Sequence, residues 1–421
     1  MGRTTERALI ACTLALCALQ AHAFKMGFQG QLDELRAQAS GSLNAKLDDE
    51  PHRLQFGDPI HEDMTQASIE MAAANADRMQ CTTSREKVEA FVRQAAQPRL
   101  SHGMCCHKGA VSKACSVIGM FGGNQAFADV LTPMQSGVRW NDDPCHMTHE
   151  AVSRVSWALW MTGNNYMEYN NSNYASHFHE HQFLHAMAPS ARNDPKPLAA
   201  RQTRKRILMW AEFALRVADG SIPPNTKLKD VRALLSTQMQ QDFELAFGGY
   251  GPRTVALLFT GLDDGDPQLV RQTALGALFH TVQDSYSSSH VERANDPFKD
   301  GTPGVLNKGD IVRFYTYRGQ DGGKHGKADR RPHDLAAAQI DDLHPVSIGA
   351  QLLACTAASQ NAPSQWEEGM KIVQRNFTLR DADINRASTP GKDYVFFAIS
   401  VRDEATYAGA GAKSTYWHHK V

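Results

Sequence analysis

The 421-residue chain lacks several features that would assign it to a class of proteins. After its N-terminal segment it has no apolar run that approaches the roughly 20 residues of a membrane-spanning helix. It has no internal repeat, no long linker and no Cys-x-x-Cys pair. Its formal net charge is only −1, without the basic surplus that steers a protein to nucleic acid, although a local basic groove is compatible with that charge.

The N-terminal segment has the layout of a secretory signal peptide. Two arginines precede an apolar stretch from Ala8 to Leu19, and a small-x-small pattern follows at residues 21–23. A buried N-terminal helix is the alternative interpretation. We expect residues 1–23 to be removed, which leaves a secreted or periplasmic chain that starts at Phe24 and has no transmembrane anchor.

Cysteine is scarce, with 8 in the chain, of which two lie in the predicted signal peptide. An even number of remaining cysteines in an exported chain indicates disulfide bonds, whose pairing the sequence leaves open. A four-cysteine zinc site is the competing interpretation, and the lack of a Cys-x-x-Cys pair disfavours it. The remaining cysteines are Cys81, Cys105, Cys106, Cys115, Cys145 and Cys355.

Helical spacing of apolar residues dominates the chain, and a hydrophobic content of 42% allows a sizeable core. We predict a mainly α fold: one helical domain over residues 24–377 with long disulfide-braced loops, and a C-terminal extension, 378–421, packed on the same domain. Short strands are expected at 311–317 and 394–401. Helices are expected at 62–72, 147–160, 202–218, 228–247, 266–286, 335–358 and 366–377.

The strongest chemical signal is a His-x3-Asp-x5-His segment formed by His280, Asp284 and His290. The first two lie one turn apart on one helix face, where an imidazole and a carboxylate can bind one zinc ion. The same spacing also describes an ordinary surface pair, which contributes only a few tenths of a kcal/mol. Apolar neighbours predict that this helix is buried, and a buried carboxylate needs partners or a metal.

Three further segments carry metal-ligand residue types. His325 and Asp329 repeat the His-x3-Asp spacing, in polar surroundings that are also typical of a solvated loop. Asp142 and Asp143 lie in a Trp-Asn-Asp-Asp-Pro stretch, which is also ordinary turn chemistry. His177 begins a His-Phe-His-Glu-His run that fits either a zinc site or a polar strand edge.

Taken in order from His61 to Asp329, these segments resemble the zinc-dependent bacterial phospholipases C and the related single-strand zinc nucleases of fungi and plants. The His-x3-Asp-x5-His segment is the most specific part of the resemblance. The resemblance implies three zinc ions in a cleft between helices. The implied ligands are Asp142 (with Asp143 as its rival), His177, His280 and Asp284 for one zinc, His290, His325 and Asp329 for a second, and His61 with the bridging Asp284 for a third.

The resemblance implies a zinc-dependent phospholipase C that acts on phospholipids at a membrane surface. It would hydrolyse the glycerol–phosphate bond of lipids such as phosphatidylcholine. Two or three zinc ions would neutralise the phosphate and lower the pKa of the attacking water. Asp142 and Asp284 would be the catalytic carboxylates. His179, His181 and His185 are candidates for supporting the ligands from behind.

The chain departs from the family pattern at the third zinc. Family members place a mature N-terminal Trp close before the first His, whereas Phe24 lies 37 positions before His61. Asp329 is closer to the nuclease branch, and a basic cluster at residues 324–331 could contact nucleic acid, so a single-strand nuclease or nucleotidase is the alternative. A non-catalytic exported zinc-binding protein is the second alternative, which the open coordination positions disfavour.

Overall fold

The computed structural model describes residues 60–94, 133–141, 179–189, 198–260, 265–295, 306, 308–316, 338–340, 343–359 and 363–389. These residues are mostly helical, as the sequence predicts. None of their helices has the length and apolar character needed to cross a bilayer. The predicted signal peptide, the predicted helix at 147–160 and the predicted strand at 394–401 lie outside the described residues.

Two long helices, α11 (Ala200–Ala218) and α15 (Pro267–Asp284), pack against each other at the centre of the fold. Both confirm predicted helices. Asp266 caps α15 by accepting a hydrogen bond from the Gln268 amide, and the proline at its first position fits the helix start. From Val270 onward α15 is buried on nearly every side, because other helices cover it all round.

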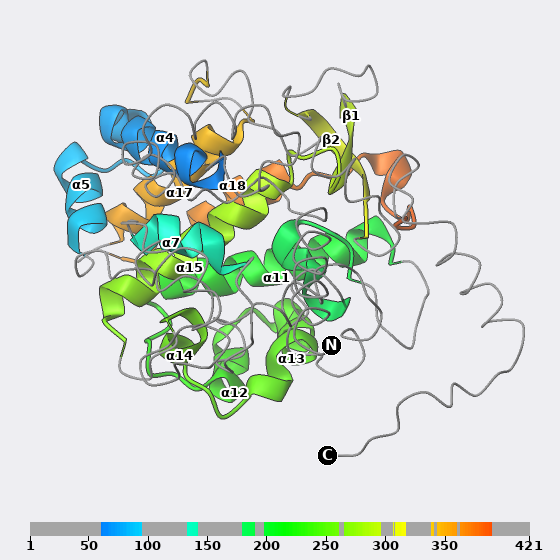
Figure 1. The fold of residues 1–421 in the computed structure, drawn as a ribbon, viewed down its shortest axis with the longest axis horizontal. Helices are drawn as coiled ribbons and strands as arrows, with labels where there is room; N and C mark the ends of the chain where they lie inside the picture. Colours follow the sequence, from blue (N-terminus) through cyan, green and yellow to red (C-terminus); the bar gives the residue numbers. More distant parts are fainter. Residues whose placement is uncertain are drawn as a thin grey trace, which may run out of the picture.

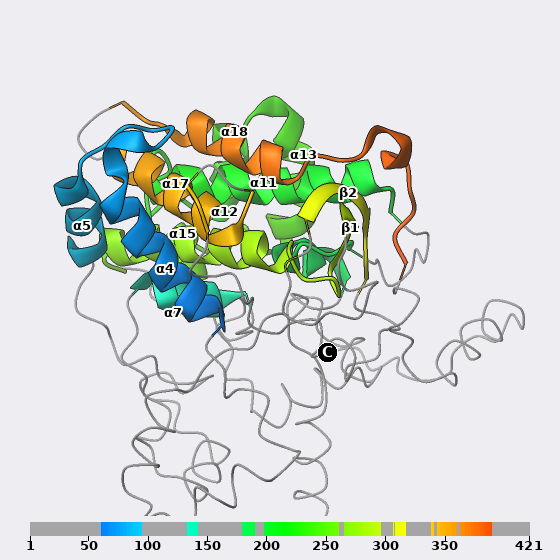
Figure 2. The same cartoon turned by 90° about the horizontal axis from the view of Figure 1, so that it is seen from above.

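Three helices cover α11 and α15. Helix α17 (Pro345–Ala358) and helix α18 (Trp366–Asn376) pack on each other and on the central pair, and α7 (Pro133–Trp140) crosses α15 on another side (Figures 1 and 2). The predicted helix at 335–358 starts later than expected, at Pro345. Proline disfavours the helical conformation of the residue before it, and His344 in that position is extended and caps the helix.

The helix that carries His61 comes first among the described elements. It is α4 (Ile60–Ala74), which packs against α17 and α7 and is followed by η1 (Ala76–Arg78) and α5 (Arg85–Gln94). A disulfide bond joins Cys81 to Cys355, so the chain just after α4 is covalently attached to α17. The other four cysteines of the predicted mature chain lie outside the described residues.

The prediction of a single helix over 228–247 is wrong. The backbone amide and hydroxyl of Ser236 both donate to the buried carboxylate of Glu212, and this side-chain acceptor replaces the helical one. Short elements therefore occupy the region. They are α12 (Leu228–Val231), η4 (Arg232–Leu234), η5 (Thr237–Met239), α13 (Gln240–Phe247), η6 (Gly248–Tyr250) and α14 (Val255–Thr260).

A two-stranded antiparallel sheet follows the central helix. Strand β1 (Val291–Asn295) pairs with β2 (Lys308–Phe314), which overlaps the predicted strand at 311–317. Residues 378–389, with the short η9 (Asp381–Asp383), run beside β2 and the start of α11 through isolated bridges. Strand β1 begins directly after His290, so the sheet fixes the end of the turn that follows Asp284.

Candidate metal centre

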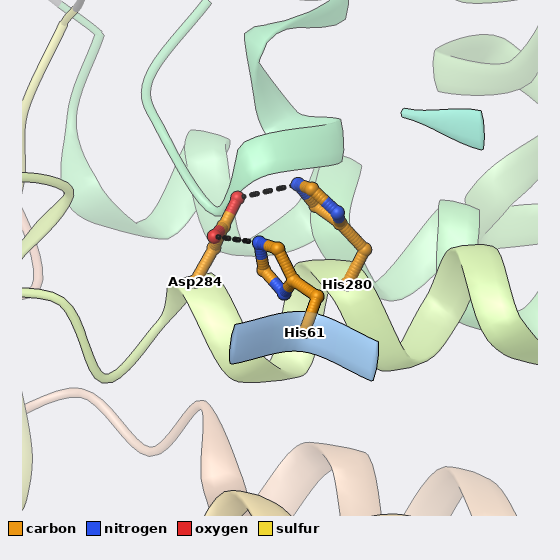
Figure 3. Close-up of side chains that lie close together, drawn as sticks. All are labelled: His61, His280 and Asp284. Carbon is orange, nitrogen blue, oxygen red and sulfur yellow. Dashed lines mark ion pairs between the residues drawn. The ribbon is translucent and has the colours of Figure 1, made fainter. Parts of the chain in front are cut away.

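The described residues contain a buried cluster that can hold a metal ion, formed by His61, His280 and Asp284. His280 and Asp284 project from successive turns of α15, and His61 approaches from the first turn of α4 (Figure 3). The Nε2 atom of His280 lies 2.9 Å from Oδ2 of Asp284, and that of His61 lies 3.5 Å from Oδ1. All three side chains are 0% exposed.

Two more histidines surround the same carboxylate. His185, at the end of η3 (His179–His185), places Nδ1 2.9 Å from Oδ2 of Asp284. Nδ1 of His290 lies 3.7 Å from that oxygen and 2.6 Å from the carbonyl oxygen of His185. Four buried imidazoles therefore approach one carboxylate, and they come from three separate parts of the chain.

A hydrogen bond on the side of the His280 ring away from Asp284 sets the tautomer of this histidine. Its Nδ1 lies 2.5 Å from the carbonyl oxygen of Val138, which can only accept, so the proton is on Nδ1. In the neutral ring Nε2 then presents a lone pair to Asp284. A carbonyl that holds a histidine in this tautomer is the usual support of a metal ligand.

His61 has the same design. Its Nδ1 lies 2.5 Å from Oε1 of Gln283, and the amide of Gln283 donates to the hydroxyl of Thr65 at 3.2 Å, which sets the orientation of the amide. The proton of His61 is therefore on Nδ1, and Nε2 directs a lone pair at Asp284. Two lone pairs from different helices thus face a carboxylate, an arrangement that a cation stabilises.

The closest contacts form a triangle. Nε2 of His280, Nδ1 of His185 and Oδ2 of Asp284 are each 2.9 Å from the other two. One proton can lie along only one edge of such a triangle, whereas one metal ion can bind all three atoms. The edges are close to the separation of about 3.3 Å between ligands of a tetrahedral zinc, so the residues fit the group that the sequence implies.

A buried arginine holds the turn that follows Asp284. The guanidinium of Arg293 donates to the carbonyl oxygens of Ser285, Gly309 and Asn376, at 3.0, 2.9 and 3.2 Å. It lies 4.7 Å from the ring centre of Tyr286. Burial lowers the pKa of Arg293 and raises that of the Tyr286 phenol, while the arginine partly opposes the latter shift. A cation at the end of α15 also complements the helix dipole.

Four of the predicted ligands, His61, His280, Asp284 and His290, lie together in this cluster. His185, which the sequence places among the supporting residues, is within ligand distance instead. The sequence feature that points to a buried His185 is its apolar surroundings, Phe-Leu before it and Ala-Met-Ala after it, which resemble those of His280. The predicted ligands that lie outside the described residues are Asp142 with its rival Asp143, His177, His325 and Asp329.

Another predicted supporting residue, His181, packs away from the cluster. Its Nε2 lies 2.7 Å from the carbonyl oxygen of Ala246, and its ring contacts Phe183, Phe247 and Tyr250. His181 therefore belongs to the aromatic core beside α13.

Comparison of the chain with protein-family models, curated proteins and solved structures finds no match.

Proposed function

We propose that this protein is a zinc-dependent phosphodiester hydrolase, and specifically a phospholipase C that cleaves phospholipids such as phosphatidylcholine. The observation that carries the proposal is the triangle of ligand atoms at His185, His280 and Asp284. Its donors are imidazole nitrogen and carboxylate oxygen, the set that catalytic zinc sites use. The lipid substrate is supported by the ordered sequence resemblance.

The surroundings of Asp284 support the binding of more than one metal ion. Its Oδ2 faces His185 and His280, whereas its Oδ1 faces His61. A carboxylate whose two oxygens face different ligands suits a bridge between two metals. We therefore propose two to three zinc ions, with His290 and the segment at residues 325–329 supplying further ligands.

Bound zinc would neutralise the phosphodiester charge and lower the pKa of a water molecule towards about 7. The chain itself keeps the ligand atoms deprotonated, since Val138 and Gln283 retain the protons of His280 and His61 on Nδ1. We propose that Asp142 orients the attacking water. Asp142 directly follows Asn141 in the sequence. The side-chain amide of Asn141 donates to the carbonyl oxygen of Leu184, the residue before His185.

Export is part of the proposal. The disulfide between Cys81 and Cys355 is typical of an oxidising compartment and agrees with the predicted signal peptide. A single-strand nuclease is the competing activity, favoured by Asp329 in a position where the family varies between Glu and Asp.

Metal content and activity are to be measured on the same purified sample. We expect two to three zinc ions per chain, release of diacylglycerol from phosphatidylcholine vesicles, loss of activity with a chelator and recovery with zinc. The variants Asp284→Asn and His280→Ala should lose zinc and at least about 100-fold in activity, since each removes a direct ligand. His181→Gln, which retains an N–H donor for Ala246, is the matched control and should keep both.

The outcomes separate the alternatives. Digestion of single-stranded DNA without diacylglycerol release selects the nuclease. Stoichiometric zinc with neither activity selects the binding protein. Full activity of His280→Ala on every phosphodiester tested would overturn the assignment of the site.

A further inference from the structure

We infer that Thr281 is a positioning residue whose hydroxyl, together with the Asn141 amide, sets the metal affinity of the cluster. The inference depends on the proposed metal binding. It concerns a buried hydrogen-bond network that lies behind the ligands and touches none of the ligand atoms.

The network converges on one carbonyl group. The hydroxyl of Thr281 donates to the carbonyl oxygen of Leu184 at 2.7 Å, and the amide of Asn141 donates to the same oxygen at 2.7 Å. The indole N–H of Trp210 donates to the Thr281 hydroxyl at 3.1 Å, which directs its proton towards Leu184. All four residues are buried, so these bonds form where water does not compete.

The hydroxyl makes this long-range bond in preference to a local one. A helical threonine usually bonds the carbonyl one turn earlier, but here the carbonyl of Ala277 lies 3.4 Å away and that of Leu184 only 2.7 Å. Thr281 thus connects α15 to η3, and Asn141 connects the end of α7 to the same point.

Three of the four residues are sequence neighbours of a proposed ligand. Thr281 follows His280, Leu184 precedes His185, and Asn141 precedes the predicted ligand Asp142. Fixing the backbone at Leu184 therefore fixes how η3 presents His185 to α15.

The segment that carries His185 needs such support. The next residue, Ala186, has a φ of 52°, in the left-handed region that costs a non-glycine residue about 1 kcal/mol or more. Bonds at Leu184, at the His185 carbonyl and between the Ala188 amide and Tyr315 hold this conformation in place. Without the bonds at Leu184, relaxation of Ala186 would move His185 away from the triangle.

The test compares two threonines of one helix. Thr281→Val keeps the shape and removes the hydroxyl, and Thr281→Ser restores it. Thr273→Val, about two turns earlier on α15 and buried, is the matched control because it makes the same change away from the network. The zinc dissociation constant of each full-length chain is measured by competition with a chromophoric chelator, and the cobalt-substituted forms are compared by visible absorption.

We expect Thr281→Val to bind zinc 10- to 100-fold more weakly and to change the cobalt spectrum. Thr281→Ser and Thr273→Val should match the wild type in both. Equal zinc affinity of Thr281→Val and wild type overturns the inference, as does equal weakening in Thr281→Val and Thr273→Val. A wild-type chain that binds no zinc overturns the proposed function instead.

A second variant keeps the inference testable if Thr281→Val does not fold. Asn141→Ala removes the other donor to Leu184 and should also weaken zinc binding. If both single variants fold, their effects should not add in the double variant, because both act through one carbonyl. Additive effects, or an Asn141→Ala chain with wild-type affinity, contradict the network.

Discussion

At Asp284, a carboxyl group lies in the protein interior among four buried imidazoles. Burial of an uncompensated carboxylate costs several kcal/mol, so hydrogen-bond partners or a bound cation must offset that cost. As neutral rings, His61 and His280 cannot donate to Asp284, because both already donate from Nδ1.

A second residue beside the site, Tyr286, makes the fold sensitive to alkali. Burial raises its pKa, so the native protein keeps the phenol protonated while the unfolded chain ionises above about pH 10. Stability from this group is therefore complete below pH 10 and is lost as the pH rises further. Between pH 9 and pH 11 the loss should be about 1.4 kcal/mol.

We expect Tyr286→Phe to remove this loss. The hydroxyl of Tyr286 has no hydrogen-bond partner among the described residues. At pH 7 the variant should therefore be at least as stable as the wild type, with a gain of up to about 1 kcal/mol. Urea titrations of both proteins at pH 7, 9 and 11 measure the difference. A parallel decline of the two proteins between pH 9 and pH 11 would contradict the prediction.

The sequence predicts that His280, Asp284 and His290 lie near one another, because they are close together along the chain. Spacing alone places the first two on one helix face, and the buried turn brings His290 back. His185 is harder to predict, because its approach to Asp284 depends on a tertiary bond at Leu184 and on the unusual φ of Ala186. Neither feature has a local sequence signal.

Among the elements, the crossing of α7 over α15 positions the site most directly. Gly137 and Gly276 meet there, and a Cβ at Gly276 would lie 2.8 Å from the Gly137 Cα and closer still to the Met134 carbonyl oxygen. This approach brings the next residue of α7, Val138, to within hydrogen-bond distance of His280. A side chain at either glycine would separate the helices.

We therefore expect Gly276→Ala to reduce stability by about 1–3 kcal/mol, the range for overpacking a core, and to weaken zinc binding. Gly249→Ala is the control, because a Cβ there meets nothing within 4 Å. Urea titration and the chelator competition measure the two effects. Wild-type values for Gly276→Ala would show that the helices can separate without harm.

Helix prediction works where apolar spacing and end signals agree. Helices α11, α15 and α18 have both. The region 228–247 has helical spacing, but Ser236 bonds Glu212 and interrupts it, and that acceptor is a distant residue. Strand β1 is short and includes Glu292, Arg293 and Asn295, so its pairing with β2 is decided by the buried contacts of Arg293.

For the whole molecule, the Cys81–Cys355 bond joins positions 274 residues apart. Such a bond restricts the unfolded chain strongly and typically contributes about 2–5 kcal/mol. It also holds the segment after α4 against α17, and α4 supplies His61.

We expect the double variant Cys81→Ala, Cys355→Ala to be about 2–5 kcal/mol less stable than the oxidised wild type. A reducing agent should lower wild-type stability by more than it lowers that of the variant. Chemical denaturation with and without the reductant measures both differences. An equal response of the two proteins would show that this bond contributes little.

The position of α4 has a consequence for how the protein is made. This helix is the first of the described elements, yet it packs on α17, which lies close to the other end of the chain. A nascent α4 therefore lacks its contacts with α17 until most of the polypeptide has been synthesised. Under the proposed function, a metal ion that needs His61 as a ligand would bind only after α4 has packed on α17, so it would come from the compartment in which folding finishes.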